Sequence, residues 1–153
     1  MSTMSRLAWL VFILTFAYAS WIFPQLPDRI PMHFGPDGTP DAWGPRGSIF
    51  FAVGFSLFLQ LFLTFVPKLG ASVSPQIQKS KDPAAELAWA LDFIAKVRVW
   101  VAGLFLLIVW NTTSVALGHA TGLGWTFFIY TFGGVIVVLF VAIRRSRRSI
   151  GRT

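Results

Sequence analysis

The chain has no cysteine, which excludes disulfide bonds, thiolate metal sites and cysteine nucleophiles. It is also poor in charge: Asp, Glu, Lys and Arg make up 12% of its 153 residues, whereas soluble domains usually carry about 25%. Apolar residues make up 55%, and the mean hydropathy is +0.66. Because so little charge cannot cover a surface facing water, the composition predicts one integral membrane domain over residues 1–153.

Charge is absent from three long stretches, residues 7–27, 47–67 and 99–143. A helix needs about 20 apolar residues to cross the ~30 Å hydrocarbon core of a bilayer. The third stretch is long enough for two crossings, and three glycines between residues 118 and 124 divide it. We therefore expect an all-α membrane protein, a four-helix bundle with transmembrane helices at about 7–23, 48–66, 99–117 and 125–143.

The basic residues predict the orientation, because cytoplasmic loops are enriched in Lys and Arg. Eleven of the 13 lie on the side of both termini: Arg6, Lys68, Lys79, Lys81, Lys96, Arg98, Arg144, Arg145, Arg147, Arg148 and Arg152. The other two, Arg29 and Arg46, lie on the opposite side. Both ends are thus expected inside, with an extracytoplasmic loop at 24–47, a cytoplasmic loop at 67–98 and a basic tail at 144–153.

The cytoplasmic loop contains the signals of a helix start. Asp82 fits the N-cap position, Pro83 the first helical position and Glu86 the first turn. No Pro or Gly follows until Gly103, so the third transmembrane helix is expected to begin near residue 83. Apolar residues along 83–98 pack within the protein or, in the alternative, bind another membrane subunit, as the Trp-rich spans could also do.

The N-terminus has a second interpretation. Arg6, the apolar run that follows it and Ala17-Tyr18-Ala19 resemble a secretory signal with a small-x-small cleavage site. Hydrophobicity continues beyond that site through Phe23, which favours a retained helix. Cleavage would leave three spans in the same orientation.

The outer loop carries the most specific pattern in the chain. Six of the nine prolines and four of the 13 glycines lie within residues 24–47. Prolines fix φ and remove backbone donors, so we expect a structured loop that contains neither a helix nor a long strand. Pro36-Asp37-Gly38 predicts a tight turn, and Trp43 is expected to pack on the helix ends while Asp41 bonds to amides near Gly44.

This pattern resembles a bacterial family, the domain of unknown function 1648. The residues that carry the resemblance are Pro27, Pro31, His33, Phe34, Gly38, Pro40, Asp41, Trp43 and Gly44. The family domain occurs alone and as the N-terminal part of immunity proteins of the SdpI type. Gly35 and Arg46 stand where the family often has Asn and Lys, and no second half of the SdpI type follows residue 98. The resemblance implies a bacterial cytoplasmic (inner) membrane protein.

Two kinds of chemistry can be considered for the loop. His33, Asp37 and Asp41 could ligate a divalent cation such as Zn²⁺ or Mn²⁺, although their spacing matches no tight template. His33 and Asp41 could instead shuttle a proton, alone or with His119. The simpler interpretation is that the carboxylates cap turns. The residues identify no cofactor.

The tail is rich in arginine. Because a basic run directly after a span stops translocation and binds anionic lipid, we interpret four arginines as lipid and topology anchors rather than as a nucleic-acid site. They are Arg144, Arg145, Arg147 and Arg148.

Two functional hypotheses result. The first is a non-enzymatic membrane protein, either an SdpI-like envelope or immunity-type factor or an accessory subunit of a membrane complex. The alternative is a small-molecule transporter or membrane enzyme that uses His33 and Asp41. The uncharged spans disfavour transport of ions.

Overall fold

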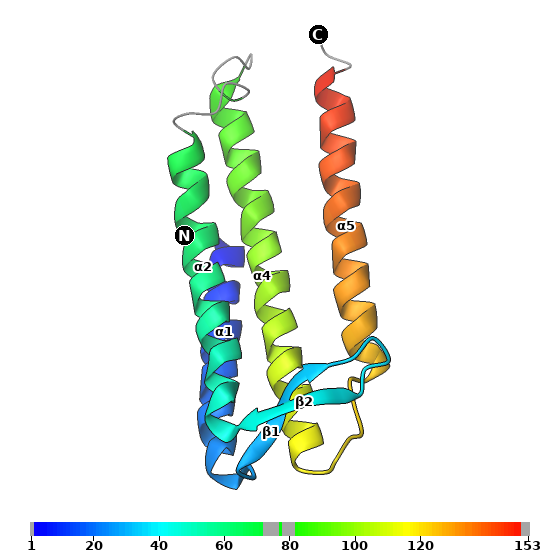
Figure 1. Cartoon of the computed structure of the whole chain (residues 1–153). Coiled ribbons are helices and arrows are strands. Elements are labelled where there is room, and N and C mark those ends of the chain that lie inside the picture. Colours follow the sequence, from blue (N-terminus) through cyan, green and yellow to red (C-terminus); the bar gives the residue numbers. More distant parts are fainter. Residues whose placement is uncertain (1, 72–76, 78–81, 151–153) are drawn as a thin grey trace.

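The computed structural model of the protein describes residues 2–71, 77 and 82–150. Long helices dominate it: α1 (Thr3–Ile22), α2 (Ile49–Ala71), α4 (Pro83–Ala116) and α5 (Trp125–Ile150) (Figure 1). Each of these four is long and apolar enough to cross a membrane. The expected fold class of a multi-pass helical membrane protein is therefore confirmed at this level.

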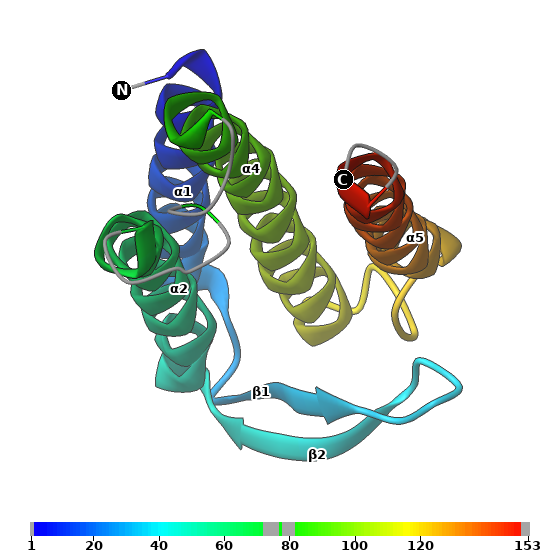
Figure 2. The same ribbon diagram turned by 90° about the horizontal axis from the view of Figure 1, so that it is seen from above.

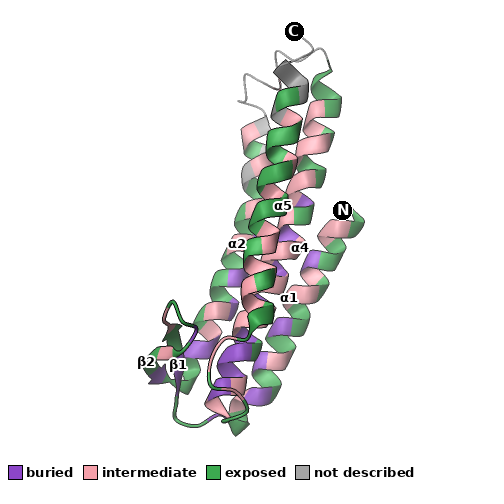
Figure 3. Cartoon of the chain, turned by 90° about the vertical axis from the view of Figure 1, so that its right-hand side faces the viewer, coloured by how far each residue is buried: buried purple, intermediate pink, exposed green. Residues whose placement is uncertain are grey.

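The helices are arranged as three plus one. Seen along the bundle, α1, α2 and α4 form one group, and α5 stands to one side and packs against α4 (Figure 2). No residue of the membrane-length window of α5 is buried, whereas about a quarter of each corresponding window in the other three is (Figure 3). The packing is thus less even than in the expected four-helix bundle.

Helix α4 begins and ends at local signals. The Asp82 side chain accepts a hydrogen bond from the Ala85 amide at 3.0 Å, and Pro83 opens a helix that continues without a break for 34 residues. This confirms the predicted helix start. At the other end Gly118 has a φ of 74°, and the His119 amide donates to the Ser114 carbonyl at 2.8 Å. This left-handed cap is a Schellman motif, which satisfies the last carbonyls of the helix.

Besides α4, two more helices extend beyond the apolar spans. Helix α2 continues through Pro67 to Ala71, and α5 continues through the arginines to Ile150. Charge marks where a segment leaves the hydrocarbon, but a helix can continue into water, where long basic side chains are solvated. Residues 72–76 and 78–81 of the expected cytoplasmic loop, residues 151–153 of the tail and the side chain of Arg148 lie outside what the structure describes.

The loop at 24–47 contains a β-hairpin with strands of six residues each, where we had expected neither a helix nor a long strand. Strand β1 (Arg29–Phe34) pairs antiparallel with β2 (Pro40–Pro45), between the short 3₁₀ turns η1 (Phe23–Gln25) and η2 (Arg46–Ser48). A two-stranded hairpin has only edge strands, where a proline can lie without removing a hydrogen bond from a central ladder. Its prolines are therefore compatible with the pairing.

The best-packed part of the core lies where the hairpin meets the helices. Its buried residues come from α1, the hairpin, α2 and α4: Ala19, Ile22, Leu26, Ile30, Ile49, Val53 and Val109. Tyr18 also bonds to Thr113 of α4 through their hydroxyl groups, 2.9 Å apart. The segment around the small-x-small pattern is therefore part of the packed bundle. We call this end of the molecule the hairpin end, and the opposite end, where Arg144, Arg145 and Arg147 lie, the basic end.

Candidate functional site

The base of the hairpin is anchored in the bundle. The side chain of Ile30 is fully buried in the core, and the Arg46 amide donates to the Asp28 carbonyl at 3.0 Å. The Arg46 guanidinium lies over the ring of Phe23, 5.2 Å from its centroid. These contacts fix the hairpin at the point where both strands leave the helices.

The tip of the hairpin is a tight turn, as Pro36-Asp37-Gly38 predicted. The Gly38 amide donates to the Gly35 carbonyl at 2.9 Å, and Gly38 has a φ of 82°, a conformation that favours glycine. Asp37 accepts hydrogen bonds from both the amide and the hydroxyl of Thr39, at 3.0 and 2.8 Å. These bonds lower the pKa of the Asp37 carboxyl below its ordinary value.

The tip docks on the turn between α4 and α5. The Leu123 amide donates to the Gly38 carbonyl at 2.8 Å. Gly122 lies so close to the same carbonyl that any side chain there would collide with it. The hairpin therefore runs across the end of the bundle from α1 and α2 to the start of α5 (Figure 2). It is held at both ends, so its surface is preorganised.

Two irregularities in the strand pairing shape the middle of the hairpin. The pairs Pro31–Trp43, His33–Ala42 and Phe34–Pro40 leave one extra residue on each strand, Met32 on β1 and Asp41 on β2. Bulges of this kind twist a hairpin and redirect its side chains. Here His33 Nδ1 lies 2.6 Å from Asp41 Oδ1, although both side chains remain exposed, at 70% and 50%.

The His33–Asp41 pair has a definite chemistry. Its hydrogen bond orients the imidazole and leaves Nε2 free to bind a polar group or to exchange a proton. An exposed pair adds at most about 1 kcal/mol to stability, so folding alone does not require it. His33 and Asp41 lie side by side, as the proton-shuttle hypothesis requires. Within the part of the chain that the structure describes, no hydrogen bond joins Asp41 to an amide near Gly44, which corrects that expectation.

The metal hypothesis finds no support in this geometry. The Asp37 carboxylate accepts hydrogen bonds from Thr39, and the His33 and Asp41 side chains are hydrogen-bonded to each other. In the described part of the chain, no group of three or more His, Asp or Glu side chains is arranged to hold a metal ion. His119, on the α4–α5 turn, is exposed, and among the described contacts none joins it to His33.

The other motif residues serve the hairpin itself or its surface. Gly44 makes room for the Met32 side chain, whose sulfur occupies the position of a Cβ. Pro31 is buried, Phe34 and Pro40 are half-buried and Pro27 is exposed. Trp43 is 45% exposed rather than packed on the helix ends, which corrects that expectation. Its ring is therefore available on the surface, and Met32 of the other strand is also 51% exposed.

A second polar cluster lies inside the bundle, and sequence reasoning missed it. Arg98 of α4 is only 3% exposed, although we had assigned it to a cytoplasmic loop. Its Nε donates to Gln60 of α2, its Nη1 to Ser5 of α1, and its guanidinium lies 5.6 Å from the ring centroid of Trp9. The uninterrupted helix from Pro83 was the signal that could have placed Arg98 among its neighbours.

The predicted anchors lie at the basic end. Arg145 bonds to Glu86 of α4 at 2.5 Å and covers the ring of Trp89 at 5.0 Å from its centroid. Arg144 and Arg147 are exposed. One of the expected anchors thus also joins α5 to α4.

Comparison with known families agrees with the sequence motif. Residues 10–57 match the family model described as a domain of unknown function, DUF1648. The match covers most of α1, the whole hairpin and the first turns of α2. No curated protein and no solved structure matches the chain.

Proposed function

We propose that this multi-pass membrane protein, whose residues 10–57 match DUF1648, is a non-enzymatic envelope or immunity-type factor of a bacterial inner membrane. In this proposal the hairpin faces outward and binds a partner there. The observation that carries the proposal is the hairpin itself, fixed at both ends, with exposed His33, Asp41 and Trp43 between them.

The surface suits recognition for a physical reason. Rigid aromatic and charged side chains lose little conformational entropy on binding, and Trp is enriched among the residues that dominate binding energies. Folding does not use these three side chains for burial, because all three remain exposed. Binding to a partner would explain why these three side chains are exposed.

The tryptophans support a hairpin that lies outside the hydrocarbon core. Trp21, Trp110 and Trp125 lie at the hairpin ends of α1, α4 and α5 and are 67%, 55% and 83% exposed. Trp residues gather at the boundary between hydrocarbon and water. The hairpin follows directly beyond this belt, so it lies in the aqueous phase. The excess of basic residues at the other end favours that end as the cytoplasmic one.

The alternative function uses the same residues. The 2.6 Å His33–Asp41 pair could transfer a proton for a membrane enzyme or a small-molecule transporter. An accessory subunit would instead use the exposed apolar face of α5. The accessory subunit would keep its function when the hairpin is changed and lose it when the exposed face of α5 is changed. A proton-transfer role would depend on His33 and Asp41 and not on Trp43.

A survival assay tests the proposal. The source bacterium without this gene is challenged with envelope-active peptides and complemented with the wild type, with a His33→Ala/Trp43→Ala variant, or with Phe51→Ala as the control. Phe51 is 73% exposed and belongs to α2 rather than to the hairpin. We expect the wild type and the control to restore survival and the hairpin variant to fail at equal membrane levels. Restoration by the hairpin variant would contradict the proposal.

A further inference from the structure

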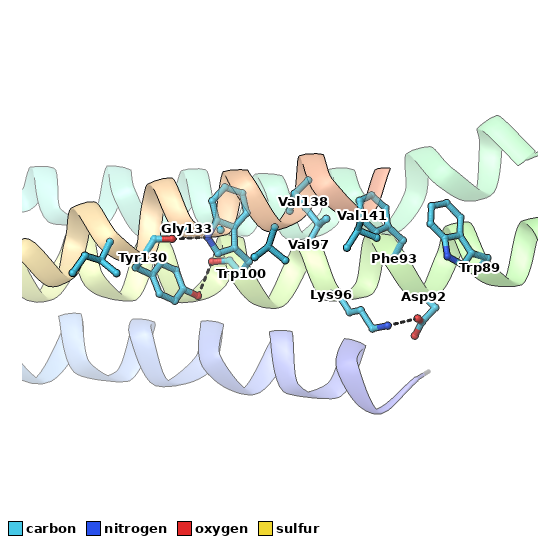
Figure 4. A pocket seen from close by; sticks show the side chains of 13 residues that line it. Trp89, Asp92, Phe93, Lys96, Val97, Trp100, Tyr130, Gly133, Val138 and Val141 are labelled. Carbon is cyan, nitrogen blue, oxygen red and sulfur yellow. Dashed lines mark hydrogen bonds and ion pairs between the residues drawn. The ribbon is translucent and has the colours of Figure 1, made fainter. Parts of the chain in front are cut away.

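Helices α4 and α5 enclose an apolar groove in the half of the protein nearer the basic end. Its volume is about 400 Å³, which lies in the range of about 300–1,000 Å³ typical of ligand sites. Phe93, Val97 and Trp100 line it from α4, and Gly133, Val138 and Val141 line it from α5 (Figure 4).

Trp100 and Tyr130 close the end of the groove that lies farther from the basic end. Trp100 Nε1 donates to the Tyr130 carbonyl at 3.2 Å, and the Tyr130 hydroxyl donates to the Trp100 carbonyl at 3.1 Å (Figure 4). Gly134 and Gly103 make this possible, because a Cβ at either position would collide with the facing ring. The side-chain polar atoms of Trp100 and Tyr130 are thus hydrogen-bonded within the protein, so this end of the groove suits an apolar ligand.

Gly133 does not bring α4 and α5 into contact, as Gly103 and Gly134 do. A Cβ added at Gly133 would meet no atom within 4 Å, although the residue lines the groove. The glycine therefore keeps space open rather than allowing two helices to touch.

The mouth of the groove is basic. A second cavity of about 420 Å³ shares Trp89 and Val141 with the first and is also lined by Arg144 and Arg145. Arg145 is paired with Glu86, and Lys96, which also lines the groove, is paired with Asp92. Within the described residues no ion pair involves Arg144, so its charge is available to an anion.

We infer that this groove binds one anionic phospholipid, with an acyl chain between α4 and α5 and the headgroup phosphate at Arg144. The residues of α4 from Trp89 to Trp100 span about 17 Å at 1.5 Å per residue. This matches one leaflet, about half of the ~30 Å hydrocarbon core. The bound lipid would fill the space between α5 and its neighbour, and this inference does not depend on the function of the hairpin.

The dimensions favour a lipid over a partner helix. A helix is about 10 Å wide, so a 17 Å length of it would occupy about 1,300 Å³. All the empty space between the two helices there, its open side included, is about 920 Å³, which is smaller than such a length of helix. Net headgroup charge distinguishes an anionic lipid from a zwitterionic one at Arg144. Both carry a phosphate, but in phosphatidylcholine the choline cation neutralises it, whereas the headgroup of phosphatidylglycerol keeps its negative charge.

The test uses the full-length protein in nanodiscs of equal parts phosphatidylglycerol and phosphatidylcholine, followed by native mass spectrometry of the released protein. We expect the wild type to retain one phosphatidylglycerol in preference to phosphatidylcholine. Gly133→Leu should abolish retention by filling the groove. Its control is Gly54→Leu, since Gly54 also has nothing within 4 Å but is exposed on α2.

A second set of variants tests the contribution of the Arg144 charge. Arg144→Gln should reduce the preference for phosphatidylglycerol at least tenfold, and Arg6→Gln, which changes an exposed arginine on α1, should not. Equal retention of both lipids by the wild type would overturn the inference. So would retention by Gly133→Leu that equals retention by Gly54→Leu, or a preference that Arg144→Gln leaves unchanged.

Discussion

Gln60 and Arg98 join α2 to α4 through two hydrogen bonds in opposite directions. The Gln60 amide donates to the Arg98 carbonyl, and Arg98 Nε donates to Gln60 Oε1, each at 3.0 Å. The Gln60 side chain is fully buried, and Arg98 Nη2 is buried without a partner among the described residues. A buried cation that has an amide rather than a carboxylate as partner depends strongly on that amide.

Gln60→Leu should therefore destabilise the protein by about 1–3 kcal/mol, because it leaves Arg98 with a buried, unpaired donor. The double variant Gln60→Leu/Arg98→Leu should lose less than the sum of the two single changes, since it removes both partners. Reversible unfolding in detergent measures each value. Additive losses would show that the two side chains are not coupled.

Docking of the hairpin tip is tested at Gly122. Gly122→Ala places a methyl group against the Gly38 carbonyl and should break the Leu123–Gly38 hydrogen bond, at a cost of about 0.5–1.5 kcal/mol. Hydrogen exchange at the Leu123 amide should become faster. Gly47→Ala is the control, because a Cβ at Gly47 meets nothing within 4 Å. Unchanged exchange in Gly122→Ala would mean that the tip is not held there.

The turn at the tip should weaken in acid. The pKa of Asp37 is lower in the folded hairpin than in the unfolded chain, because Thr39 donates to the ionised carboxylate. Its contribution is therefore fully present above the ordinary carboxyl pKa and is lost as the pH falls through the lowered value. The protection of the Thr39 amide, which is the exchange rate of the unstructured chain divided by the observed rate at the same pH, should decrease over that interval in the wild type. Asp37→Asn should remove the pH dependence, and a wild-type profile in that variant would assign it to another group.

The absence of cysteine makes the orientation easy to test. A single cysteine at Gly47, which is exposed beside the hairpin, should react with a membrane-impermeant maleimide in intact cells. A single cysteine at Arg147, exposed at the basic end, should react only after the cells are opened. The reverse pattern would invert the predicted topology and with it the outward position of the hairpin.

The sequence alone predicted the features that depend on composition or on neighbouring residues. Uncharged runs placed the four helices, because hydrocarbon excludes charge over a fixed thickness. Asp82 and Pro83 fixed the start of α4, and Pro36-Asp37-Gly38 fixed the hairpin turn, since caps and turns are made within a few residues. The motif around His33 was sufficient to identify the matching family domain.

Only the tertiary structure decided which distant residues meet. The burial of Arg98 depends on α1 and α2 covering one side of α4, and its charge alone had suggested a loop. The docking of Gly38 on Leu123 and the groove beside Gly133 likewise join segments that the sequence separates widely. Apolar runs specify that a helix crosses a membrane but not which neighbour it packs against. That choice depends on the shape of the helix surfaces, here on glycines that admit a facing ring or leave a space open.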